Sequence, residues 1–414
     1  MTDPILQQRL GAWIDAHFDQ QVAFLQAVVR IPTDTPPGNN APHAEAVAGM
    51  LESAGWPVER HAVPAQEVHD YGLESITNLI VRRRYGASGP TLALNAHGDV
   101  VPPGEGWTRP PYGAVIEDGY LYGRAAAVSK SDFATYVFAL RALEALGVPL
   151  AGSVELHFTY DEEFGGLLGP GWLLAQGLTR PDYVIAAGFS YAIVTAHNAC
   201  LQLEVTLHGR AGHGAMPETA VDALQAATRV LNAIYDELPA LKAIRSSVPG
   251  IGSPTMIVGR IDGGTNTNVV PGKVVLRLDR RMIPEEDPVA VESRVRALVE
   301  DSVRGLPGIR LEIRRLLLSQ ALRPQPAVAP LVESLQRNAR AIMGEDIPAL
   351  GTPLYADARL YSEYGIPALL YGAGPRSVEE SSAKQANERL LLDDLRRATK
   401  VVALTLLDFL GPPV

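Results

Sequence analysis

The chain has 414 residues, enough for two or three domains, and its 47% hydrophobic and 20% charged residues are ordinary for a globular protein. The formal net charge of −10 argues against nucleic acid as a partner, because binding to phosphates requires clustered Lys and Arg. The single cysteine, Cys200, excludes an intramolecular disulfide and a thiolate cluster for zinc, and we expect it to be a small buried apolar residue.

The first half of the chain alternates between helical and strand patterns. Residues 1–31 have apolar residues at helical spacing. We expect no signal peptide, because these residues do not show a positively charged segment followed by an apolar core. No apolar run reaches membrane-spanning length, so we expect a cytoplasmic protein without a membrane partner. The alternation predicts an α/β sheet. The expected elements are a helix over about 43–54, strands over 78–84 and 91–97, a helix over 131–146, and buried strands beginning at Ser153 and Pro181.

The pattern changes at about residue 195. Strands and two long amphipathic helices then follow in a β-α-β-β-α-β order that ends near residue 318. We interpret 195–318 as a smaller α+β domain, ferredoxin-like in its order of elements. It is inserted into a larger α/β domain that consists of residues 1–194 and 319–414.

The stretch from Leu94 to Lys130 carries the most informative motif. His97 and Asp99 lie two residues apart at the end of an apolar run, so in an extended strand both side chains leave the same face. A His held by a neighbouring carboxylate is typical of a metal ligand or an acid/base group. The alternative is a His at a strand end, followed by an Asp that begins a turn.

The residues after His97 extend this motif. HGDVVP, Trp107 and PPYGAVIEDGYLYGR together resemble the two-zinc family of aminoacylases, glutamate carboxypeptidases, acetylornithine deacetylases and succinyl-diaminopimelate desuccinylases. The resemblance covers nearly the whole chain. It implies a zinc-peptidase-like catalytic domain with a central mixed sheet, plus an inserted domain that makes a homodimer. In the family this stretch ends in GRGAxDxKG, and its Asp bridges two zinc ions, but here that position is Val128.

The resemblance implies five metal ligands, of which this sequence keeps two, His97 and Glu163. The bridging carboxylate falls on Val128, the fourth ligand on Gly188 and the fifth, a His, on Lys384. Zinc takes His, Cys or carboxylate ligands, so none of these three replacements can serve. We therefore expect no metal cofactor. Glu163 would instead face the Lys384 ammonium, which would neutralise the buried carboxylate without an ion.

The resemblance also implies a set of substrate-facing residues that this chain keeps. Each of these residues also has a purely structural interpretation, such as a turn or a solvated strand face, but their joint presence indicates a substrate cleft. We expect Asp99 and Lys384 to assist catalysis, and His97 and Glu163 to line the substrate site. The kept set is Glu162 as general base, His213 as oxyanion donor, Asn268 and the Gly372, Ala373, Gly374 loop as substrate contacts, Arg281 as carboxylate anchor, and Asp357 with Arg359 in a DAR-like segment.

These residues predict a metal-independent hydrolase that cleaves an amide bond in a small peptide-like or N-acyl amino acid substrate carrying a carboxylate. Three alternatives remain: a non-catalytic binding protein, a metal-free epimerase or lyase, and a mononuclear metal hydrolase built on His97, Asp99 and Glu163. A Ser129 nucleophile activated by Lys130 is a further possibility. However, adjacent residues rarely present their side chains to each other.

Overall fold

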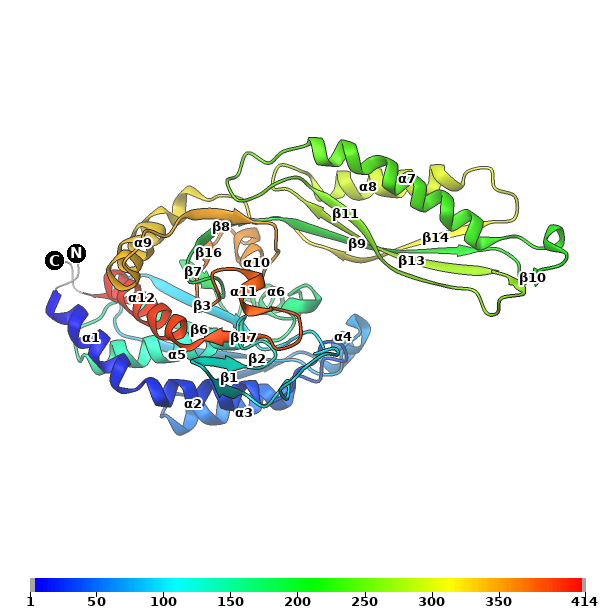
Figure 1. Cartoon of the computed structure of the whole chain (residues 1–414). Coiled ribbons are helices and arrows are strands. Elements are labelled where there is room, and N and C mark those ends of the chain that lie inside the picture. Colours follow the sequence, from blue (N-terminus) through cyan, green and yellow to red (C-terminus); the bar gives the residue numbers. More distant parts are fainter. Residues whose placement is uncertain (1–3, 412–414) are drawn as a thin grey trace. The chain divides into compact units, whose positions relative to one another are not determined.

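The computed structural model describes residues 4–411 and divides them into two compact units (Figure 1). The first unit contains the described residues up to Thr195, then Pro324–Leu350, and the described residues from Ala356 onward. The second contains Ala196–Arg323 and the short segment Gly351–Tyr355. Within residues 4–411, no helix combines the length and the apolar character that crossing a bilayer requires.

The first unit is built on an eight-stranded mixed sheet, as the α/β pattern predicted. Strands β3 (Thr91–His97) and β6 (Ser153–Thr159) are parallel neighbours, and His97 is opposite Thr159. Both strands are buried over nearly their whole length, as expected for parallel strands that are covered on both faces. Because the carboxyl ends of parallel strands meet at one edge, the motif after β3 lies beside the acidic residues that follow β6.

Helices cover this sheet and form its main hydrophobic core. Helix α5 (Lys130–Ala145) packs on β3 and β6 and also contacts α2 (Phe18–Val29) and α12 (Leu392–Leu410). In this core the Phe133 ring stacks on Phe158 with centroids 4.1 Å apart. Helix α5 therefore begins directly under the edge of the sheet where β3 and β6 end.

The remaining elements of the first unit complete the sheet and its cover. The sheet order is β1-β2-β6-β3-β7-β16-β8-β15, so β6 lies between β2 and β3, and a separate small sheet has the order β17-β5-β4. The sequence patterns did not predict that small sheet or the short helix α4. The strands are β1 (Glu59–Ala62), β2 (Thr77–Arg84), β4 (Val115–Glu117), β5 (Tyr120–Tyr122), β7 (Tyr183–Ala186), β8 (Ile193–His197), β15 (Ala349–Thr352), β16 (Ala368–Leu370) and β17 (Arg389–Leu391). The helices are α1 (Pro4–Ala16), α3 (Ala41–Ser53), α4 (Ala65–Tyr71), α6 (Pro170–Ala175), α9 (Ala329–Met343), α10 (Ala358–Glu363) and α11 (Val378–Ser381), with single 3-10 turns at Glu162–Phe164 and Pro326–Val328.

The second unit is a four-stranded antiparallel sheet with two helices, in the expected β-α-β-β-α-β order. The sheet order is β11-β13-β9-β14, so β11 and β14 are its edges. Alternating residues of β9 and β13 form its own apolar core with the helices. Cys200 is buried as expected, but its side chain lies on the opposite face of β9, where Sγ is 3.6 Å from Oδ2 of Asp279. The elements are β9 (Ala199–His208), α7 (Ala223–Ala243), β11 (Thr255–Gly263), β13 (Lys273–Met282), α8 (Pro288–Val303) and β14 (Arg310–Leu318), with β10 (Gly212–His213) and β12 (Val269–Val270) as a small separate ladder and a 3-10 turn at Pro217–Thr219.

Candidate active site

The turn after β3 and the turn after β6 are joined through the Asp99 carboxylate. Asp99 is fully buried, and its two oxygens accept hydrogen bonds from the backbone N–H groups of Glu162 (3.2 Å) and Glu163 (2.9 Å). The same carboxylate lies 3.4 Å from Nδ1 of His97. Asp99 therefore fixes the imidazole and the acidic turn relative to each other.

His97 and Glu162 face each other across this junction. Nε2 of His97 lies 3.8 Å from Oε2 of Glu162, and both side chains are largely buried. Burial lowers the pKa of His97, but Glu162, Asp99 and Glu163 together outweigh it and raise the pKa to about 10. Burial raises the pKa of Glu162, and the neighbouring His97 partly opposes that change. The pair is thus a buried acid/base couple at the edge of the sheet.

Glu163 pairs with Lys384, which reaches it from the loop before β17. Nζ of Lys384 lies 2.6 Å from Oε2 of Glu163; the Glu163 side chain is 8% exposed and that of Lys384 is 63% exposed. The backbone N–H of Lys384 donates to Glu388, which forms a buried ion pair with Arg124 at 2.6 Å. The position where the resemblance places the fifth metal ligand therefore holds an ammonium group in contact with a carboxylate.

These residues do not fit a two-zinc centre. Val128 offers only an aliphatic side chain beside the peptide bond to Ser129, which is cis. At Gly188, an added Cβ would lie 2.9 Å from the backbone of Leu370 and Tyr371, so a ligating side chain there would require a backbone shift. In the part of the chain that the structure describes, no three His, Cys, Asp or Glu side chains converge to hold a metal ion. Two of the three ligands expected for a mononuclear site also have other partners: Asp99 accepts hydrogen bonds from two backbone N–H groups, and Glu163 binds Lys384.

Ser129 has a structural role that competes with the nucleophile hypothesis. Its hydroxyl accepts a hydrogen bond from the N–H of His97 (2.9 Å) and donates to the His97 carbonyl (3.1 Å). Nζ of Lys130 donates instead to the carbonyl of Ile31 at 2.8 Å. Ser129 thus holds the end of β3 in place, and the two adjacent side chains serve different partners.

Asp132 is a buried carboxylate beside the Gly-rich loop, and no sequence motif indicated it. Oδ1 of Asp132, in the first turn of α5, accepts the N–H of Ala373 at 2.7 Å. Burial raises the pKa of Asp132 to about 8, although the Ala373 N–H and His97 favour the charged form. Its only sequence signal was an acid on the apolar side of a buried helix.

The expected Gly-rich loop packs against this carboxylate and against the loop segment that directly follows β7. An added Cβ at Gly372 would lie 2.1 Å from Asp132 Oδ1, and one at Gly374 would lie 2.5 Å from the Gly188 carbonyl oxygen. The N–H of Gly374 donates to that same oxygen at 2.9 Å. The absence of side chains at these glycines is therefore required by packing within the unit, which is a different reason from the expected approach of substrate.

The DAR-like segment lies behind the acidic turn. Asp357 and Arg359 are both buried, and the Arg359 guanidinium donates to the carbonyl of Gly165. Burial, and next the charge of Glu162, raise the pKa of Asp357 to about 8. An added Cβ at Gly166 would lie 2.2 Å from Asp357 Oδ1, so the turn closes tightly over this acid.

The other candidate residues belong to the second unit. His213 and Asn268 lie together, because β10 pairs with β12 and the N–H of Gly214 donates to the Asn268 carbonyl at 2.8 Å. Nδ1 of His213 accepts the N–H of Ala215 (3.1 Å), and both His213 and Asn268 are exposed. Arg281 lies on β13, where its side chain is about one-third exposed at 29%.

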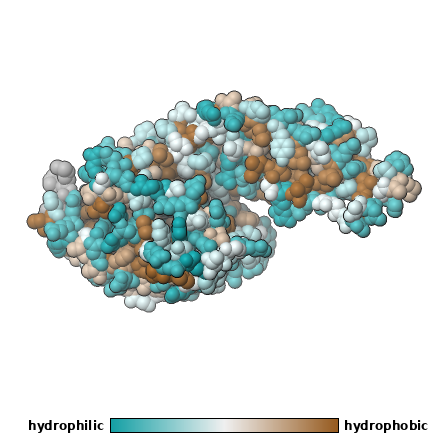
Figure 2. All heavy atoms as spheres, in the orientation of Figure 1, coloured by the Kyte–Doolittle hydropathy of each residue, from teal (hydrophilic) through white to brown (hydrophobic). Residues whose placement is uncertain are grey.

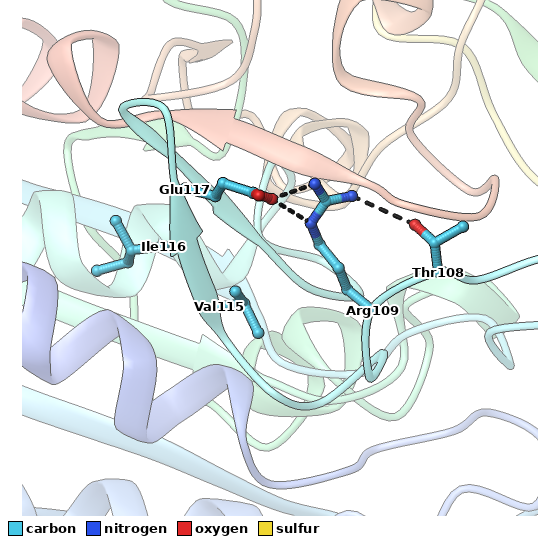
Figure 3. Close-up of a pocket in the computed structure, with 5 residues that line it drawn as sticks. All are labelled: Thr108, Arg109, Val115, Ile116 and Glu117. Atoms are coloured by element: carbon cyan, nitrogen blue, oxygen red, sulfur yellow. Dashed lines mark hydrogen bonds and ion pairs between the residues drawn. The ribbon is translucent and has the colours of Figure 1, made fainter.

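The first unit also has a surface pocket that none of these candidate residues lines (Figure 3). The pocket is lined in part by the residues of β4, and an ion pair between Arg109 and Glu117 spans it. Arg109 and Glu117 neutralise each other, and the lining residues contain no acid/base couple. We therefore do not assign catalysis to this pocket. Its lining residues are Thr108, Arg109, Val115, Ile116 and Glu117.

Comparison with known proteins identifies the family. The family model for "Peptidase family M20/M25/M40" matches residues 93–408. The chain belongs to the M20/M25/M40 peptidase family. An acetylornithine deacetylase of Myxococcus xanthus is 29% identical over 378 residues, which are 90% of this chain and 93% of that protein. A succinyl-diaminopimelate desuccinylase of Gluconobacter oxydans is 31% identical over 355 residues, 83% of this chain and 87% of that protein.

Solved structures agree with this assignment at the level of the fold. A dipeptidase from Saccharomyces cerevisiae matches with a TM-score of 0.84 at 15% identity, and the match covers 99% of both chains. The resemblance inferred from the HGDVVP stretch is therefore confirmed, as is the mixed α/β architecture. This M20 chain carries the scaffold of a hydrolase family whose matching members include a deacetylase and a desuccinylase.

Proposed function

We propose that this M20 protein hydrolyses an amide bond in a small peptide-like or N-acyl amino acid substrate without the dinuclear zinc centre of its family. The observation that carries the proposal is the 2.6 Å contact between Lys384 and Glu163 at a position implied to hold metal ligands. A carboxylate bound to an ammonium is neutralised already, and Val128 and Gly188 offer no donor for zinc.

The chemistry would use the acid/base couple that remains. Glu162 takes a proton from the attacking water, whose oxygen forms a bond to the amide carbon. The carbon–nitrogen bond then breaks, and Glu162 returns the proton to the leaving nitrogen. His97, at 3.8 Å, orients Glu162, and Lys384 supplies positive charge near the developing oxyanion. Asp99 supports both steps because it holds His97 and the acidic turn together.

The family resemblance also implies roles for residues of the second unit. His213 and Asn268, which share one corner of that unit, would stabilise the oxyanion and hold the substrate. Arg281 would bind a carboxylate of the substrate, because a planar guanidinium fork suits that group.

The test is a turnover assay with a panel of N-acyl amino acids and dipeptides, comparing the native protein with Glu162→Gln. We expect the variant to lose roughly a hundred- to ten-thousand-fold in turnover, the usual contribution of a positioned base. Glu67→Gln, which changes an exposed glutamate on α4, is the matched control and should keep the native rate. Full turnover in Glu162→Gln would contradict the assignment.

The same assay separates the other candidate functions. Ligand binding without any product would indicate a binding protein. Inversion of a chiral centre without release of an amine would indicate an epimerase. Either outcome would replace hydrolysis as the conclusion.

We also propose a homodimer formed through the second unit. Its edge strand β11 exposes Ile257 (56%) and Ile261 (52%), and α7 exposes Tyr235 (54%). Figure 2 shows hydrophobic atoms on the visible face of this unit. An unpaired edge strand with exposed apolar side chains favours pairing with a second copy. Light scattering coupled to size exclusion should give twice the chain mass, and Ile257→Lys should give a monomer.

A further inference from the structure

Arg281 is held by an acidic neighbour on its own strand. Asp279 and Arg281 lie two residues apart on β13 and therefore project from the same face. Nε of Arg281 donates to Oδ1 of Asp279 at 2.7 Å, and Nη2 donates to Oδ2 at 3.2 Å. The carboxylate thus takes one edge of the guanidinium in a two-point contact.

Asp279 is itself fixed by the neighbouring strand β9. Its Oδ2 accepts from the amide of Gln202 at 3.0 Å and lies 3.6 Å from the Sγ atom of Cys200. The strand register explains these contacts, because Asp279 is opposite Gln202 and Arg281 is opposite Cys200. Because these donors already surround the Asp279 carboxylate, it is suited to orient Arg281 and not to accept a hydrogen bond from a ligand.

An aromatic ring borders the guanidinium as well. The centre of the Arg281 guanidinium lies 5.3 Å from the ring centroid of Tyr355, which belongs to the short segment Gly351–Tyr355 of the same unit. A guanidinium has five N–H donors in a rigid fork, and Asp279 takes Nε and one N–H of Nη2. The edge formed by Nη1 and the other N–H of Nη2 therefore points away from Asp279.

We propose that Asp279 is a positioning and selectivity residue: it turns the far edge of Arg281 toward a ligand and restricts that edge to a planar anion of single charge. This inference rests on the proposed role of Arg281 as a carboxylate anchor and adds the charge class of the ligand. A carboxylate matches the fork in two-point geometry. A doubly charged group, such as a phosphonate, meets greater repulsion from the fixed Asp279 charge.

The test measures binding and needs no turnover. Calorimetry of the full chain would use two ligands, levulinate, whose ketone replaces the scissile amide, and its analogue in which a phosphonate group replaces the carboxylate. The pH would be one at which the phosphonate is doubly charged. Native protein should prefer levulinate. Asp279→Asn should move the ratio of the two dissociation constants roughly tenfold toward the phosphonate, because one unit of repulsion within a few ångströms is removed at a partly exposed site.

Three variants make the result specific. Asp279→Glu keeps the charge and should restore the native ratio, whereas Arg281→Gln should lose both ligands. Asp262→Asn is the matched control, because Asp262 and Arg260 form the same two-apart pair on exposed β11, where Asp262 is opposite Val275. It should leave the ratio unchanged.

An unchanged ratio in Asp279→Asn, or failure of the native protein to bind levulinate, would overturn the inference. Absence of amide hydrolysis would contradict only the proposed function, since this binding pattern does not depend on turnover. Thermal unfolding of each variant shows that the comparison is between folded proteins.

Discussion

Nζ of Lys384 lies 2.6 Å from Oε2 of Glu163, and this ion pair occupies the position where the family resemblance places two metal ligands. Nearby, Asp99 accepts two backbone N–H groups, and Gly188 packs against the backbone of Leu370. Glu163 and Asp99 therefore have other partners within the chain, and Gly188 is too closely packed for a side chain.

The Lys384–Glu163 pair should show measurable but modest coupling. Lys384→Met and Glu163→Gln should each lower the free energy of unfolding, and the double variant should lose less than the sum of the two. We expect a coupling of about 0.5–1 kcal/mol, because the Lys384 side chain is mostly exposed and solvent screens the attraction. Urea unfolding of the four proteins measures it. Strict additivity would show that the pair does not form in solution.

The Arg124–Glu388 pair should matter far more. Both side chains are almost fully buried, and Glu388 also accepts the backbone N–H of Lys384. Glu388→Gln leaves the Arg124 charge buried without its counter-charge and should cost about 3–5 kcal/mol in unfolding free energy. The exposed Arg340–Asp346 pair provides the control, and Asp346→Asn should change unfolding very little. Equal effects of the two substitutions would contradict the buried arrangement.

Asp132 should make stability depend on pH. Its pKa is raised to about 8 in the folded protein from the ordinary value of 3.8, chiefly by burial. Between these values the folded state holds a proton that the unfolded state has lost, so this group stabilises the fold at low pH, and its contribution falls as the pH rises toward 8. The slope is at most about 1.4 kcal/mol per pH unit.

The measurement is the unfolding free energy of native protein and Asp132→Asn from pH 4 to pH 8, the range set by the two pKa values. The Asn variant keeps an acceptor for the Ala373 N–H but cannot ionise. It should therefore gain stability relative to the native protein as the pH rises. Parallel pH curves for the two proteins would show that Asp132 is already ionised in the fold.

Gly188 should not tolerate a side chain. An added Cβ would lie 2.9 Å from Leu370 and Tyr371 atoms, so Gly188→Ala should cost about 1–3 kcal/mol through strain in the strand pairing. Gly49→Ala is the matched control: nothing lies within 4 Å of its added Cβ, and helix α3 should gain up to about 1 kcal/mol. A neutral Gly188→Ala would mean that a ligating residue fits there after all.

Much of the architecture followed from local pattern. Apolar runs and helical spacing located β3, β6, α5 and α7, because those segments are long and periodic. The short strands β4, β5 and β17 carry too few residues to show a period. β4 and β5 form a local hairpin, but β17 pairs with β5 from more than 250 positions away. The position of β6 between β2 and β3 also depends on tertiary packing, which sequence order does not reveal.

The candidate site could be predicted where a motif carried it. The Glu163–Lys384 contact was expected from charge balance, and it is present. Asp132 was missed because a single acid in an apolar helix has no motif, and its significance comes from Ala373 and Gly372, which are distant in sequence. The two-point contact of Asp279 with Arg281 was missed for a related reason: the DxR spacing is common on solvated strands, and only the contacts from β9 distinguish it.

The most direct test of metal-independent hydrolysis combines metal analysis with turnover. Protein purified without added metal would be analysed by plasma mass spectrometry, and then assayed on its best N-acyl amino acid or dipeptide substrate with and without a strong chelator. The account predicts well under one metal ion per chain and the same rate in both assays. A stoichiometric metal content together with loss of activity on chelation would contradict it.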